Sequence, residues 1–66
     1  MRNEYLISDT RPPHCYGGGH KYHAQRTRNR PWHVLCELLS PDTCNYTLVV
    51  ADDRAAALRE AKSRWA

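Results

Sequence analysis

Residues 46–65 read YTLVVADDRAAALREAKSRW, and this stretch decides the fold class that we expect. It begins with strand-forming residues that alternate between two faces, and one face carries Tyr46, Leu48 and Val50. Asp52 or Asp53 then caps a helix, because a carboxylate accepts hydrogen bonds from the free N–H groups at a helix start. The helix is predicted over residues 53–65, which are rich in alanine and lack glycine and proline.

The predicted helix has one apolar stripe, formed by Leu58, Ala61 and Trp65 with Ala57 beside them. A helix of about 13 residues is marginally stable alone in water. We therefore expect this stripe to pack across a sheet, with Trp65 as its largest side chain.

Residues 32–50 are predicted to form a β-hairpin that supplies two strands of this sheet. Residues 32–39 are rich in apolar residues, and a strand would place Trp32, Val34, Cys36 and Leu38 on one face. Residues 40–43 read SPDT, which is a turn signal. Matching the apolar faces of the two strands predicts two cross-strand pairs, Leu38 opposite Tyr46 and Val34 opposite Val50.

The first half of the chain adds one strand at residues 4–8, followed by a basic segment rich in glycine, proline and histidine at residues 9–31. The sequence therefore predicts a single α+β domain over residues 1–66, with a C-terminal helix packed on one face of a small antiparallel sheet. The sheet has three strands, or four if residues 20–27 form another.

Length and composition exclude several classes of protein. A chain of 66 residues is too short for a deep active site, so we expect no enzyme. No apolar run is long enough to span a membrane, and the N-terminus lacks the apolar core of a secretory signal. Three cysteines are an odd number, unlike a paired disulfide framework. We therefore expect a reduced protein in the cytoplasm, or in the host cytoplasm if a phage encodes it.

The positive charge gathers in the middle of the chain. Ten Lys and Arg against seven Asp and Glu give a net charge of +3, and no acidic residue lies between Asp9 and Glu37. Arginines can hold phosphates and aromatic rings can stack on bases, so we expect a binding surface within residues 11–33. Its candidate residues are Arg11, Lys21, Tyr22, Arg26, Arg28, Arg30 and Trp32. The alternative is a solvated segment that only keeps the protein in solution.

These features favour a non-enzymatic binding protein whose partner is nucleic acid or a nucleoprotein complex. The expected outline is similar to that of compact DNA-binding modules that lay a three-stranded sheet in the major groove, a likeness of fold class alone. The alternative function is a small phage-type inhibitor, such as an anti-CRISPR protein, that blocks a host machine by contacting an acidic protein surface. An open sheet edge would also allow two copies of the chain to pair as a homodimer.

A metal site and a nucleophilic site are weaker interpretations of the same segment. Cys15, His20 and His23 are the candidate zinc ligands, but their order matches none of the standard zinc patterns. We therefore expect no cofactor, with a small zinc-stabilised module as a second alternative. Cys15 also lies close to histidines, yet no nearby carboxylate could orient an imidazole. Both Trp32 and Trp65 are expected in the core, with an exposed contact role as the alternative for each.

Overall fold

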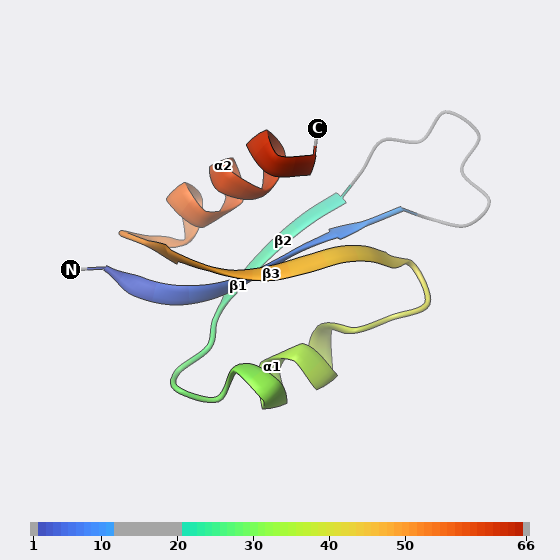
Figure 1. Ribbon diagram of the computed structural model, residues 1–66, viewed down its shortest axis with the longest axis horizontal. Coiled ribbons are helices and arrows are strands. Elements are labelled where there is room, and N and C mark those ends of the chain that lie inside the picture. Colours follow the sequence, from blue (N-terminus) through green and yellow to red (C-terminus); the bar gives the residue numbers. More distant parts are fainter. Residues whose placement is uncertain (1, 12–20, 66) are drawn as a thin grey trace.

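The structure is a computed structural model that describes residues 2–11 and 21–65. Its elements, shown in Figure 1, follow the order β1 (Asn3–Thr10), β2 (Lys21–Arg26), α1 (Pro31–Leu38), β3 (Thr43–Ala51) and α2 (Arg54–Trp65). The three strands form an antiparallel sheet and α2 packs on one of its faces, so the predicted α+β class is confirmed. The short helix α1 was not predicted from the sequence.

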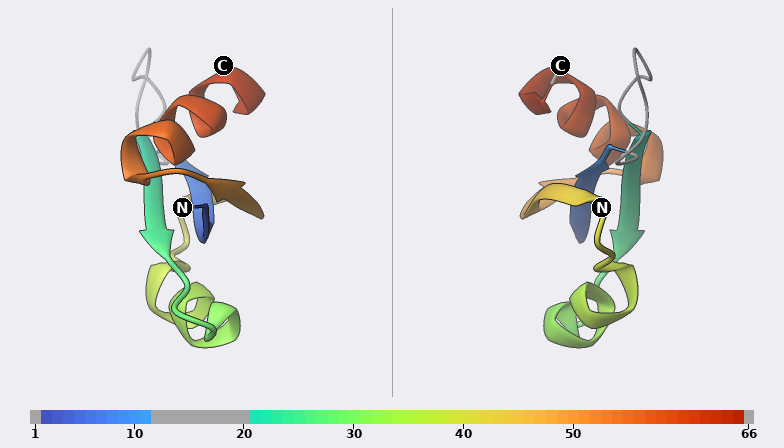
Figure 2. Two further views of the ribbon diagram at one scale, coloured as in Figure 1. Left: turned by 90° about the vertical axis from the view of Figure 1, so that its left-hand side faces the viewer. Right: turned by 90° about the vertical axis from the view of Figure 1, so that its right-hand side faces the viewer.

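The first strand lies in the centre of the sheet, which has the order β2-β1-β3. Both neighbours pair with it in antiparallel register, so that Ile7 lies opposite Ala24 of β2 and Thr47 of β3. Successive side chains of a strand point to opposite faces. Ile7 therefore faces one side of the sheet and Leu6 the other, and Figure 2 shows that α2 and α1 lie on these two opposite sides.

Helix α2 covers the face that carries Tyr5 and Ile7. Ala57 and Ala61 of α2 are completely buried there, since their small side chains allow the helix to approach the strands closely. Partly buried side chains surround this contact, including those of Leu58 and Trp65. The predicted stripe of the helix is thus confirmed. At the far end of the helix, the hydroxyl of Tyr22 donates a 3.2 Å hydrogen bond to the carbonyl of Trp65.

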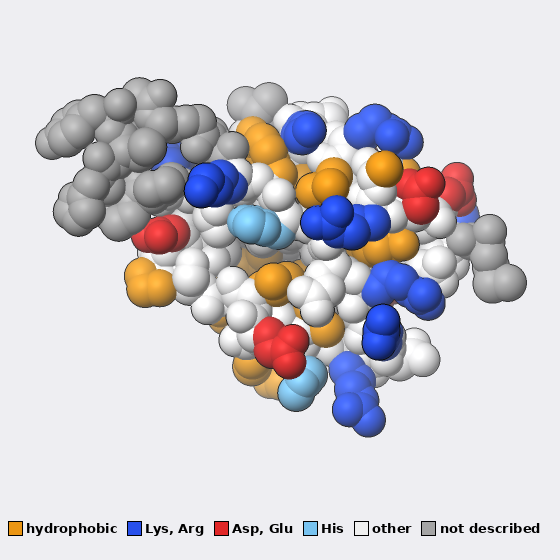
Figure 3. All heavy atoms as spheres, turned by 180° about the vertical axis from the view of Figure 1, so that it is seen from behind, with side chains coloured by type: hydrophobic (Ala, Val, Ile, Leu, Met, Phe, Trp, Pro, Cys, Tyr) orange, Lys and Arg blue, Asp and Glu red, His pale blue; other side chains and the backbone are white. Residues whose placement is uncertain are grey.

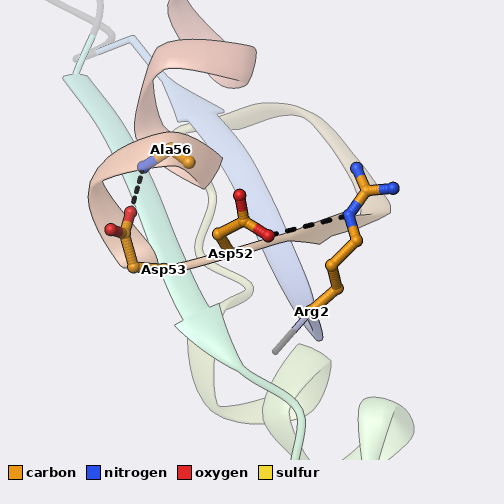
Figure 4. A network of polar contacts seen from close by, with 4 residues as sticks. All are labelled: Arg2, Asp52, Asp53 and Ala56. Carbon is orange, nitrogen blue, oxygen red and sulfur yellow. Dashed lines mark hydrogen bonds and ion pairs between the residues drawn. The ribbon is translucent and has the colours of Figure 1, made fainter.

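The start of α2 is fixed by a side-chain cap. The backbone N–H of Ala56 donates a 2.7 Å hydrogen bond to Asp53 Oδ1, which satisfies one of the free donors of the first turn (Figure 4). Asp52 points away from this turn and forms a 3.9 Å ion pair with Arg2 instead. Of the two predicted caps, Asp53 is the one that the structure uses.

The predicted strand at residues 32–39 is wrong, because this segment forms helix α1. Pro31 occupies the first turn of the helix, where its missing N–H is no loss and its fixed φ is already helical. The helical period lets Val34 and Leu35 form a buried cluster with Leu6 of β1, and the partly buried Leu38 packs against this cluster. A short apolar run fits both periods, so the alternation that we assigned to a strand was ambiguous.

The two predicted cross-strand pairs are consequently wrong as well. Strand β3 pairs with β1, which places Tyr46 opposite Ser8 and Val50 opposite Glu4. The turn at residues 40–43 does form, with the N–H of Thr43 bonded to the carbonyl of Ser40 at 3.0 Å, but it joins a helix to a strand. The third strand of the sheet is β2, which lies within residues 20–27.

Candidate nucleic-acid interface

A tight turn between β2 and α1 shapes the basic part of the molecule. The N–H of Arg30 donates a 2.8 Å hydrogen bond to the carbonyl of Thr27, while Arg28 and Asn29 have φ values of 50° and 62°. Two successive positive φ angles closed by such a bond are typical of a type I′ turn. Asparagine tolerates this conformation, but arginine has a Cβ that makes it unfavourable. The backbone therefore holds Arg28 at an energetic cost.

This turn is anchored to the central strand. Thr27 is 1% exposed, and its hydroxyl donates a 2.6 Å hydrogen bond to Oε1 of Glu4. Its N–H also donates a 3.2 Å hydrogen bond to the carbonyl of Glu4. Thr27 thus fixes the point at which the chain leaves the sheet, and with it the direction of the arginines that follow.

The turn and α1 enclose a cleft of about 380 Å³, which we call the basic cleft. Its lining residues are Gln25, Arg26, Thr27, Arg28, Arg30, His33, Val34 and Glu37. The three arginines that alternate in the sequence are therefore brought together. They do not form the single extended row that we expected, because the turn bends the chain after β2.

The arginines of the basic cleft keep their charges available to a ligand. Arg26 donates a 3.3 Å hydrogen bond to the amide oxygen of Asn3, which leaves its charge uncompensated. Within residues 2–11 and 21–65, neither Arg28 nor Arg30 forms an ion pair with a carboxylate. The lining also contains one acidic residue, Glu37, whose Oε1 lies 3.0 Å from Nε2 of His33.

Two further cations extend this surface along β2. Lys21 is exposed at the other end of the strand, and Arg54 of α2 donates a 2.9 Å hydrogen bond from Nε to the carbonyl of Ala24. We call Lys21, Arg26, Arg28, Arg30 and Arg54 the basic edge. Figure 3 views the molecule from behind, where β2 borders the sheet, and shows Lys and Arg side chains running from the α2 side to the α1 side. Sequence reasoning missed Arg54, since only the packing of α2 brings it to β2.

The remaining candidate residues lie elsewhere. Tyr22 is partly buried against α2, so its ring belongs to the core. Arg11 follows β1, and its N–H bonds to the carbonyl of Asp42 at 2.9 Å. The expectation that Trp32 is a core residue is wrong, because it is 76% exposed. Trp65, by contrast, packs against the core as predicted.

Trp32 lies in a second groove, between α1 and β3, with a volume of about 430 Å³. We call it the aromatic groove, and its lining residues are Leu6, Pro31, Trp32, Leu35, Tyr46, Thr47 and Leu48. Tyr46 is 51% exposed. The lining is predominantly apolar, which distinguishes this groove from the basic cleft on the other side of α1.

The position of α1 also changes how the sheet could meet a ligand. Leu6 at the centre of the sheet is buried beneath Val34 and Leu35 of α1. Helix α1 thus covers the centre of this face, while Tyr46, Leu48 and Val50 of β3 stay exposed beside it. The basic edge and the aromatic groove are two of the accessible surfaces of the described chain.

The metal and thiol candidates are only partly covered by the structure. Of the three candidate zinc ligands, Cys15 and His20 lie outside the described residues. His23 is exposed on β2, with Nε2 3.4 Å from the hydroxyl of Thr10. In the part of the chain that the structure covers, no cluster of three metal-ligating side chains occurs. Cys36 and Cys44 are free and exposed.

Comparison with protein-family models, with curated proteins and with solved structures finds no match to this chain. Among the described residues, no helix is both long enough and apolar enough to cross a membrane.

Proposed function

We propose that this protein is a non-enzymatic binding protein that contacts the phosphates of a nucleic acid, free or in a nucleoprotein complex, through its basic edge. One observation carries the proposal: Arg26, Arg28 and Arg30 line a single cleft, and none is neutralised by a carboxylate among the described residues. A guanidinium group matches the geometry of a phosphate and binds it with two hydrogen bonds.

The strained turn at Arg28 and Asn29 supports the same proposal. Backbone strain at a residue is maintained only where the surrounding structure fixes it, and such residues gather at binding sites. Arg28 is in the left-handed region and exposed, and Thr27 anchors the turn that carries it. The three guanidinium groups are therefore attached to a prearranged segment, which lowers the entropy lost when a ligand binds.

The test is the salt dependence of binding to labelled DNA, single-stranded and duplex. Phosphate contacts release counterions, so the affinity should fall steeply as salt increases. Replacing Arg26, Arg28 and Arg30 by alanine should reduce the slope of log K against log salt by about two to three.

A matched control removes the same number of positive charges elsewhere. Arg59, Lys62 and Arg64 are exposed on α2, and their triple alanine variant has the same net charge as the test variant. This control should retain most of the slope. Equal losses in the two variants would mean that net charge alone drives binding, which contradicts a site at the cleft.

The experiment also separates nucleic-acid binding from the alternative of a phage-type inhibitor that contacts an acidic protein surface. Such an inhibitor would bind neither form of DNA at low salt. Absence of binding to both forms, and to RNA of the same sequence, would therefore overturn the proposed function.

A further inference from the structure

The aromatic groove contains apolar side chains that stay exposed instead of packing into the hydrophobic core. On this side of the sheet the buried contact is made by Leu6, Val34 and Leu35. Trp32 stays outside that contact although tryptophan has the largest apolar surface of any side chain. Exposed apolar side chains gathered in one groove are typical of a binding site.

The two most exposed aromatic rings of the described chain share this groove. Trp32 comes from the first turn of α1 and Tyr46 from the neighbouring strand β3, so each ring is attached to regular secondary structure. A volume of about 430 Å³ lies within the range of pockets that hold small organic molecules. The groove therefore has room for a planar ring beside the two side chains.

The basic cleft and the aromatic groove meet at the start of α1. Arg30 lines the cleft and Trp32 lines the groove, with Pro31 between them. Two residues of chain span at most about 7 Å, so the guanidinium-bearing and ring-bearing positions are close neighbours. Pro31 fixes its own φ, which restricts how far the two positions can move apart.

We propose that the ligand of both surfaces is a single-stranded nucleic acid, whose phosphates contact the basic cleft while an unpaired base stacks in the aromatic groove on Trp32 and Tyr46. This inference rests on the proposed function and names its substrate class. A single strand offers both the charged backbone and the free faces of its bases. In a duplex the bases are stacked and paired, so the rings of the groove could not reach their faces.

The test compares an oligothymidine of about ten nucleotides, within the site sizes of single-strand binders, with a duplex of the same length. We expect the single strand to bind more tightly. Trp32→Ala and Tyr46→Ala should each weaken single-strand binding about five- to 150-fold, the effect of losing one stacked base, and leave duplex binding unchanged. Trp32→Phe should restore part of the affinity, because phenylalanine also stacks.

A matched control is Val50→Ala. Val50 is exposed on the same face of β3 but does not line the groove, so its removal should leave both affinities unchanged. Trp32 is exposed and the variants should stay folded, which circular dichroism would verify. Quenching of tryptophan fluorescence by the single strand gives a second readout, which should be lost in Trp32→Phe but not in Val50→Ala.

The test distinguishes a failure of the stacking inference from a failure of the proposed function. Equal weakening of single-strand and duplex binding by Trp32→Ala, or no weakening of either, would overturn the stacking inference and leave the phosphate site in place. A change of elution volume in Trp32→Ala, with unchanged DNA binding, would assign the groove to a second copy of the chain and overturn it as well. Absence of binding to both forms of DNA and to RNA of the same sequence would refute the proposed function itself.

Discussion

The hydroxyl of Thr27 donates a 2.6 Å hydrogen bond to the carboxylate of Glu4, and this contact anchors the turn at Arg28 and Asn29 to the central strand of the sheet. The two residues also share a backbone hydrogen bond of 3.2 Å. Because the turn carries Arg28 and leads directly to Arg30, its anchorage determines where the cationic side chains lie.

Replacing Thr27 by valine should lower the free energy of unfolding by about 1–2 kcal/mol, since a charge-assisted hydrogen bond is lost at a buried position. Urea denaturation followed by circular dichroism would measure the change. Thr47→Val is the matched control, because Thr47 makes no side-chain hydrogen bond to any described residue, and it should change stability by less than about 0.5 kcal/mol. Equal effects of the two substitutions would contradict the role of the Glu4 contact.

Two substitutions of Arg28 separate the effect of its backbone conformation on stability from the effect of its charge on binding. Arg28→Gly removes the Cβ that makes a φ of 50° unfavourable, whereas Arg28→Ala keeps it. The glycine variant should be more stable than the alanine variant by about 0.5–1 kcal/mol, measured by urea denaturation, because the left-handed cost of about 1–2 kcal/mol outweighs the extra chain entropy that glycine loses on folding. Both variants lose the guanidinium, so their affinities for nucleic acid should fall by the same factor. Equal stabilities would mean that residue 28 does not adopt the left-handed conformation in solution.

The cap of α2 offers a comparison between adjacent aspartates. Asp53→Ala should lower the free energy of unfolding by about 1 kcal/mol, because the N–H of Ala56 loses its 2.7 Å acceptor. Asp52→Ala removes only an exposed ion pair of 3.9 Å with Arg2 and should change stability by less than about 0.5 kcal/mol. Thermal melting of the two variants side by side would measure the difference. A larger loss in the Asp52 variant would show that the helix begins earlier than the structure indicates.

The sequence predicted the C-terminal part of the fold well for a physical reason. Residues 53–65 carry helix-forming residues, a capping aspartate and one apolar stripe, and these local signals all favour the same structure. Residues 32–38 carry signals that conflict. Their apolar residues fit a strand and a helix equally, and the choice depends on contact with Leu6, which only the folded sheet provides.

The candidate site was predicted only in part, because some of its features are local in the sequence and others depend on the fold. The concentration of arginines at residues 26–30 is visible in the sequence, and the structure gathers these three in one cleft. The places of Tyr22 and Trp32 were not visible, because they depend on which face of the sheet each helix covers. Tyr46 and Arg54 join the two surfaces only through the pairing of β3 with β1 and the packing of α2 on β2.

The central position of β1 has a consequence for how the chain acquires its structure. Asn3 pairs with Ala51, so the first strand completes its hydrogen bonding only when residues near the opposite end of the described chain reach it. Contacts between such distant positions require a large loop to close before any stabilisation follows, which slows folding. During synthesis on the ribosome, β1 can therefore pair with β2 first, whereas its edge toward β3 stays unpaired until residue 51 has been translated.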